Sequence, residues 1–96
     1  MPTEPCIEAA GVPRELRLEL FRLMLLQRFA EERIMALYRQ GRITGSVYTG
    51  YRQEAVGAGA GLALGPGDVV APLNREQSCH YARGVPVAHV LRNFLG

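Results

Sequence analysis

The most informative stretch of this chain is Val69-Val70-Ala71-Pro72-Leu73-Asn74-Arg75-Glu76-Gln77. Its β-branched valines favour a short buried strand over 69–72, and Pro72 ends that strand because proline has no N–H to donate to a ladder. The polar residues from Glu76 onward predict the start of a helix. An arginine between a strand and a helix lies where open α/β sheets bind anionic ligands. The stretch therefore predicts a phosphate site at Arg75, and an arginine that merely faces solvent in such a turn is the competing interpretation.

A long helix precedes this stretch. Pro13 suits its first turn, where the missing N–H costs nothing, and Gly41 is the expected left-handed stop after Gln40. Apolar residues occupy two opposite faces of this helix. One face carries Leu18, Phe21, Leu25, Phe29 and Ala36, and the other carries Leu16, Leu20, Leu23, Ile34 and Tyr38. A surface helix of a small monomer normally buries one face. We therefore expect a covering surface from more of the same chain or from another subunit, and self-association of the isolated chain.

Three further helices and a loop complete the pattern. Residues 42–51 read as a loop, and Gln53 to Leu64 reads as a helix rich in glycine and alanine. Each glycine inside a helix costs about 1 kcal/mol relative to alanine, which predicts that another backbone approaches this helix closely. A short helix is expected from Gln77 to Ala82, and Pro86 opens a last helix that runs through Leu95.

Composition narrows the possible functions. The 96 residues are 48% hydrophobic and 21% charged, which indicates one small globular domain or part of a larger one. A net charge of +2 with interspersed signs gives no case for a nucleic-acid partner, and the apolar runs are too short to cross a membrane. Cys6 and Cys79, with no secretory signal, fit a reducing cytoplasm, which is the predicted location. His80 and His89 have no further ligand at metal-binding spacing.

Several short motifs lie around residues 69–77 in a fixed order. They are Arg28-Phe29-Ala30-Glu31-Glu32, Gln53-Glu54-Ala55, Pro66-Gly67-Asp68, and Asn74-Arg75 followed by Arg83-Gly84. In this order and spacing, the chain from about Leu16 to Gly96 resembles the opening segment of the alpha subunit of thiamine diphosphate-dependent 2-oxo acid dehydrogenases, of the pyruvate and branched-chain type.

The resemblance implies an α/β class, namely a thiamine diphosphate-binding fold when complete. This chain would be its mostly helical N-terminal part, with a first strand near 69–72. Residues 1–12 would form a flexible N-terminal segment, and residues 13–96 would form an incomplete part of the thiamine diphosphate-binding domain.

The resemblance also implies a function. Such a subunit works in a heterotetramer with a beta subunit, decarboxylates a 2-oxo acid on thiamine diphosphate, and transfers the acyl group to the lipoyl arm of an acyltransferase. It assigns Asn74 and Arg75 to the diphosphate of the cofactor and Tyr48 to the substrate channel. Two departures stand out: Asn74 replaces the commoner tyrosine, and Arg52 replaces the usual glycine.

The same resemblance implies that the residues for metal binding and catalysis lie outside this chain. The magnesium ligands of the resembled subunits lie downstream, and the glutamate that activates the thiamine ring comes from the beta subunit. No catalytic residue and no metal ligand is therefore expected here, and the chain alone is expected to be inactive. The alternative interpretation is a catalytically inactive helical interaction module, or a gene fragment derived from the alpha subunit.

Overall fold

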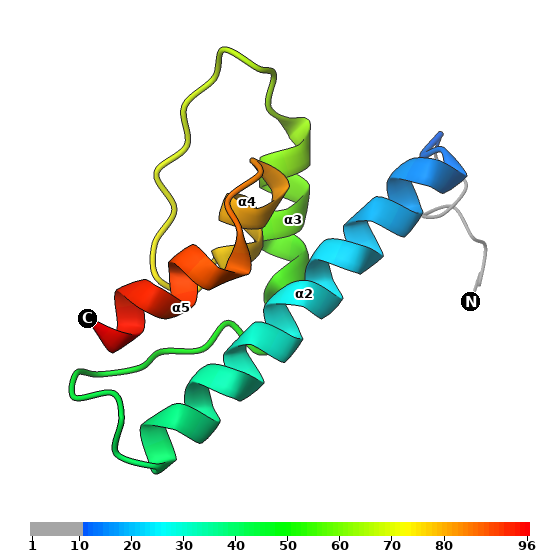
Figure 1. Cartoon of the computed structure of the whole chain (residues 1–96). Coiled ribbons are helices and arrows are strands. Elements are labelled where there is room, and N and C mark those ends of the chain that lie inside the picture. Colours follow the sequence, from blue (N-terminus) through cyan, green and yellow to red (C-terminus); the bar gives the residue numbers. More distant parts are fainter. Residues whose placement is uncertain (1–10) are drawn as a thin grey trace, which may run out of the picture.

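The computed structural model describes residues 11–96, and the expected flexible segment 1–12 lies almost wholly outside them. The described part contains the helices α2 (Arg14–Arg39), α3 (Glu54–Ala63), α4 (Gln77–Ala82) and α5 (Val87–Leu95). α2 is the longest of these helices. Figure 1 shows the other three helices beside it, while its first turns extend beyond them. Within residues 11–96, no helix has the length and apolar character that crossing a membrane requires.

The predicted bounds of α2 are confirmed. Pro13 occupies its N-cap with φ −63°, and Gly41 follows its end in the left-handed region with φ 79°. The face turned toward the other helices buries six side chains, which are Leu23, Gln27, Ala30, Glu31, Ile34 and Leu37. Two hydrophobic clusters form along this face, one around Leu23 with Ala58 of α3 and Tyr81 of α4, the other around Ile34 with Ile43.

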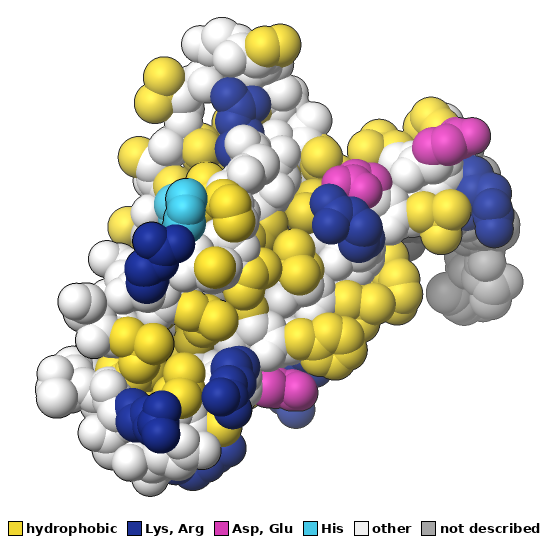
Figure 2. Space-filling model, viewed as in Figure 1, with side chains coloured by type: hydrophobic (Ala, Val, Ile, Leu, Met, Phe, Trp, Pro, Cys, Tyr) yellow, Lys and Arg dark blue, Asp and Glu magenta, His cyan; other side chains and the backbone are white. Residues whose placement is uncertain are grey.

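The opposite face of α2 has no cover within the described residues, as the two-faced pattern predicted. The exposed fractions are 51% for Leu18, 57% for Phe21, 37% for Leu25 and 60% for Phe29. We call these four residues the outer face of α2. Figure 2 shows hydrophobic side chains on the surface along this helix. Contiguous exposed apolar side chains of this kind are a feature of surfaces that contact other proteins.

The glycines of α3 explain how closely α4 approaches it. A Cβ added at Gly57 would lie 2.6 Å from the Oγ of Ser78, and one added at Gly61 would lie 2.6 Å from the Cβ of Ala82. A Cβ added at Gly59 would meet nothing within 4 Å. The predicted close approach is therefore confirmed for Gly57 and Gly61, which face α4, and is wrong for Gly59.

The prediction of a buried strand at 69–72 is wrong. No strand forms anywhere in residues 11–96, and Val69 is 90% exposed. The chain between α3 and α4 instead forms the long arching loop drawn in yellow in Figure 1. The physical reason is that a strand is stable only when its N–H and C=O groups pair with a neighbouring strand. The described residues supply no such neighbour, and the complete α/β fold is not displayed by them.

The base of the arching loop is held by a side chain from α4's end. The guanidinium of Arg83 donates to the carbonyl oxygens of Gly65, at 3.0 Å, and Asp68, at 2.8 Å. The carboxylate of Asp68 in turn accepts the N–H of Gly65 at 2.7 Å. The Pro66-Gly67-Asp68 motif and the Arg83-Gly84 motif are thus one structural unit, although fifteen or more residues separate the bonded partners.

Candidate functional site

Asn74 and Arg75 lie on the tight turn that leads from the arching loop into α4. Both residues are exposed, and neither side chain has a hydrogen bond or an ion pair within the described residues. The turn itself is fixed, because the N–H of Leu73 donates to the carboxylate of Glu76 at 2.9 Å. An amide and a guanidinium that are free to donate, on a fixed turn, form a donor set that suits phosphate oxygens.

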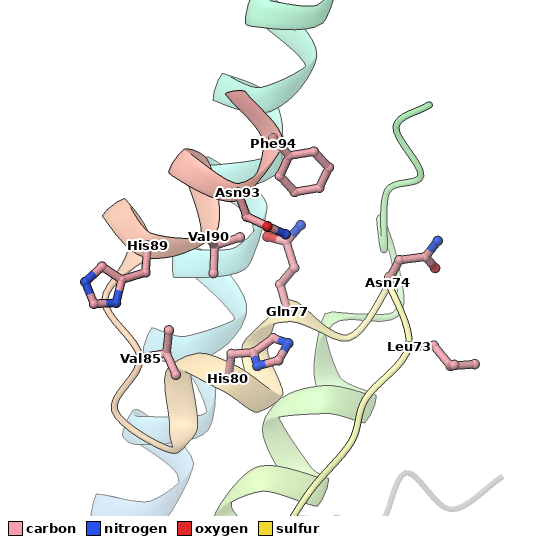
Figure 3. A pocket seen from close by; sticks show the side chains of 9 residues that line it. All are labelled: Leu73, Asn74, Gln77, His80, Val85, His89, Val90, Asn93 and Phe94. Atoms are coloured by element: carbon pink, nitrogen blue, oxygen red, sulfur yellow. The ribbon is translucent and has the colours of Figure 1, made fainter. Parts of the chain in front are cut away.

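A groove of about 360 Å³ adjoins this turn, between the turn, α4 and α5 (Figure 3). Its lining residues are Leu73, Asn74, Gln77, His80, Val85, His89, Val90, Asn93 and Phe94. The lining contains no aspartate, glutamate, lysine or arginine, so amides and imidazoles are its polar groups. At the wall formed by α4, the buried Gln77 accepts a hydrogen bond from the hydroxyl of Tyr81 at 3.0 Å. Burial raises the pKa of Tyr81 to about 12, which keeps this hydroxyl protonated.

The loop that carries Tyr48 reaches the same region through its backbone. Tyr48 is 53% exposed, and its side chain makes no hydrogen bond with the Asn74–Arg75 turn. Two residues further on, Gly50 is pressed against the carbonyl oxygen of Arg75, so closely that an added Cβ would collide with it. The structure therefore brings the loop and the turn together at Gly50, but it does not bring the side chains of Tyr48 and Arg75 into contact.

A buried polar network lies beneath this meeting point. The amide nitrogen of Gln27 donates to the carbonyl oxygen of Arg75 at 2.8 Å and to the carboxylate of Glu31 at 3.1 Å. The amide oxygen of Gln27 accepts the N–H of Ser78 at 2.8 Å. The two carboxylate oxygens of Glu31 accept the N–H of Gly50 at 3.0 and 2.9 Å. One turn of α2 thus holds the loop, the turn and the start of α4 at once.

A second charged contact fixes the start of α3. Arg28 donates to the carboxylate of Glu54 at 2.6 Å, and its guanidinium lies 5.2 Å from the ring centre of Tyr51. Burial alone would raise the pKa of the Glu54 carboxyl, but the bond from Arg28, supported by backbone N–H groups and by the charge of Arg28, outweighs burial and lowers it. Glu54 is therefore ionised near neutral pH, and the Arg28 and Gln53-Glu54-Ala55 motifs are physically joined.

The backbone conformation at Arg52 is one that favours glycine, the residue usual at this position in the resembled subunits. Arg52 adopts φ 71°, in the left-handed region that favours glycine, inside a turn closed by a 2.8 Å bond from the N–H of Gln53 to the carbonyl of Gly50. Glycine at this position would adopt the turn without the steric cost that an L side chain incurs.

Sequence reasoning missed Gln27, Glu31 and Ser78. One signal was available: Gln27 and Glu31 fall on the same helical stripe as Leu23 and Ile34, and a polar side chain on a buried stripe must find hydrogen-bond partners. The partners themselves could not be foreseen, because they lie 19 to 51 residues away along the chain.

Comparison with known proteins shows which family this chain resembles. The family model described as "Dehydrogenase E1 component" matches residues 21–96. A pyruvate dehydrogenase E1 component subunit alpha-3, chloroplastic, from Oryza sativa subsp. japonica, is 32% identical over 87 residues, which cover 91% of this chain and 20% of the rice protein. The chain thus spans about a fifth of the length of this relative. No solved structure matches the chain.

Proposed function

This chain belongs to the dehydrogenase E1 component family, and on that premise we propose that it is part of the alpha subunit of a 2-oxo acid dehydrogenase. In the assembled enzyme, Asn74 and Arg75 bind the diphosphate of thiamine diphosphate, and Tyr48 faces the substrate channel. A beta subunit completes the site, magnesium is held by residues outside this chain, and a lipoyl-bearing acyltransferase accepts the acyl group.

The observation that carries this proposal is the donor set on the 74–75 turn. Both side chains are exposed and unpaired within the described residues, while the backbone beneath them is fixed by the buried amide of Gln27. A guanidinium that is already paired with a carboxylate has fewer N–H groups left to donate to phosphate oxygens, and Arg75 is not so paired within the described residues. When bound, thiamine diphosphate supplies the electron sink for decarboxylation, whereas the residues of this chain bind and orient it.

An assembled enzyme tests the proposal. The alpha subunit that contains this sequence is co-expressed with a beta subunit and assayed with pyruvate, branched-chain 2-oxo acids and acetoin, using a dye as electron acceptor. We expect turnover with at least one of these substrates that depends on thiamine diphosphate. Arg92→Ala, a change at an exposed arginine of α5, serves as the control and should retain that activity. No cofactor-dependent turnover with any substrate would count against the proposal.

A second candidate function is a helical interaction module without catalysis. The outer face of α2 favours it, because four large apolar side chains are available there for a partner. The coding DNA beyond the Gly96 codon separates the two candidates. In the resembled subunits, magnesium and the diphosphate are held by a Gly-Asp-Gly motif followed at a distance by an asparagine. An in-frame motif of this kind supports the enzyme, whereas a stop codon directly after Gly96 supports the module.

A further inference from the structure

The buried pair Gln27 and Glu31 occupies an unusual position on α2. Both side chains are almost completely inaccessible, with exposed fractions of 0% and 1%. Burying a polar amide and a carboxylate is unfavourable unless hydrogen bonds compensate. Here every bond they make beyond the one that joins them goes to the backbone of another segment, which is the Arg75 turn, the start of α4 or the Gly50 loop.

The bonds made at position 27 require an amide side chain. Gln27 has a donor and an acceptor on one planar group, and it uses the donor on the carbonyl of Arg75 and the acceptor on the N–H of Ser78. These two backbone groups belong to the first and last residues of the 75–78 segment. The amide therefore bonds both ends of that segment and fixes its position relative to α2. No aliphatic side chain of similar size could make both contacts.

Glu31 extends the same connection to a second segment. It accepts the N–H of Gly50 with both carboxylate oxygens and also accepts the amide N–H of Gln27. Gly50 in turn abuts the carbonyl oxygen of Arg75 that Gln27 binds. The Gly50 loop and the Arg75 turn are therefore both bonded to one turn of α2, through the hydrogen-bonded pair of Gln27 and Glu31, and form one structural unit.

We propose that Gln27 is a positioning residue for the cofactor contact, acting through Arg75, with Glu31 linking the Tyr48 loop to the same unit. The proposal rests on the proposed function of Arg75 as a diphosphate ligand. It adds that the affinity of that contact is set by the amide buried beneath it. Gln27 does not touch the cofactor itself, because it is fully buried under the turn.

A double-mutant cycle in the assembled alpha/beta enzyme tests this. The dissociation constant of thiamine diphosphate, with magnesium present, is measured by quenching of intrinsic fluorescence for wild type, Gln27→Met, Arg75→Ala and the double variant. Gln40→Met is the matched control, since Gln40 is an exposed glutamine at the end of the same helix. We expect Gln27→Met to weaken binding about tenfold, and Gln40→Met to leave it unchanged.

The decisive result is the double variant. If Gln27 acts through Arg75, adding Gln27→Met to Arg75→Ala should produce clearly less loss than Gln27→Met produces in the wild type, because Arg75 is already gone and only Asn74 remains on the turn to be positioned. Additive losses would overturn the proposal, since they would mean that Gln27→Met acts by general destabilisation. If Arg75→Ala alone leaves cofactor binding unchanged, the proposed diphosphate contact fails instead, and the two failures are distinguishable.

Hydrogen–deuterium exchange gives a readout independent of the cofactor. In the 96-residue chain, Gln27→Met should increase exchange in peptides that contain Gly50 and Ser78 while peptides from the middle of α2 stay protected. Should Gln27→Met fail to fold, Glu31→Gln is the second variant, because it keeps the shape and an acceptor for Gly50. It should raise exchange at Gly50 more than at Ser78. Unchanged exchange in both segments would contradict the proposal.

Discussion

At the scale of single residues, the buried carboxylate of Glu31 gives a prediction about pH. Burial raises the pKa of the Glu31 carboxyl, and the bonds from Gly50 and Gln27 only partly oppose that rise. A raised pKa means that the folded chain binds this proton more tightly than the unfolded chain does. The contribution to stability is therefore present below the unfolded pKa of about 4.3 and is lost as the pH rises through the folded pKa.

Glu31→Gln removes this titration, because glutamine stays neutral at every pH. We expect the variant to become more stable relative to wild type as the pH rises from about 4 to about 7. Urea denaturation at a series of pH values measures the difference. A difference that is constant across the series, or that moves in the opposite direction, would contradict the placement of Glu31.

Arg52 gives a second prediction at this scale. A left-handed backbone costs a residue with a Cβ about 1–2 kcal/mol, and glycine avoids that cost while losing somewhat more entropy on folding. We expect Arg52→Gly to raise the free energy of unfolding by about 1 kcal/mol, and Arg52→Val to lower it, because a β-branched side chain tolerates this region least. Equal stability of the two variants would mean that the turn relaxes out of the left-handed region.

At the scale of elements, the three glycines inside α3 provide an internal control. Gly57→Ala and Gly61→Ala should each lower the free energy of unfolding by about 1–3 kcal/mol, because the new methyl group overlaps α4. Gly59→Ala has open space and should raise it by about 1 kcal/mol through helix propensity. Thermal or urea denaturation ranks the three variants, and stabilisation by Gly57→Ala would show that α3 and α4 are not packed as described.

The elements also show how much the sequence could reveal. The four helices of residues 11–96 were predicted close to their bounds, because apolar spacing, Pro13, Pro86 and Gly41 are local signals that act within one element. The prediction of a strand at 69–72 was wrong because a strand must pair with another strand. Such pairing is not a local property, and β-branched residues alone do not provide a partner strand.

The site divides in the same way. The motif order located Asn74, Arg75 and Tyr48 on a turn and a loop, and their roles remain predictions. The network of Gln27 and Glu31 that joins those segments was not predicted. The sequence of a helix does not indicate which distant backbone groups its glutamine and glutamate side chains bind. Only the folded arrangement brings Gly50, Arg75 and Ser78 within reach of one turn of α2.

At the scale of the whole molecule, the outer face of α2 gives a prediction about self-association. Four side chains that are each about half exposed forgo roughly 3–6 kcal/mol of burial, half of what full burial at about 1.5–3 kcal/mol each would contribute, and this is a large share of the net stability of a domain. We expect the isolated chain to self-associate through this face. Sedimentation velocity at several concentrations should show the associated species. Combining Phe21→Glu with Phe29→Glu should shift it toward monomer, whereas Val56→Glu, at an exposed valine of α3, should not.

A monomer of wild type at all concentrations would contradict this expectation. It would mean that the outer face is tolerated in water, and it would remove the reason to look for a partner there.

The Arg75 turn, as proposed, binds the diphosphate of thiamine diphosphate in an assembled alpha/beta enzyme. This is tested by measuring the dissociation constant of thiamine diphosphate for that enzyme and for its Arg75→Ala variant, at one fixed magnesium concentration and ionic strength. Loss of a partly buried charged contact predicts binding weaker by about 2–4 kcal/mol, with Arg75→Lys recovering only part because an ammonium cannot reproduce the guanidinium fork. An alanine variant that binds the cofactor as tightly as wild type would contradict the claim and leave Arg75 a solvated arginine.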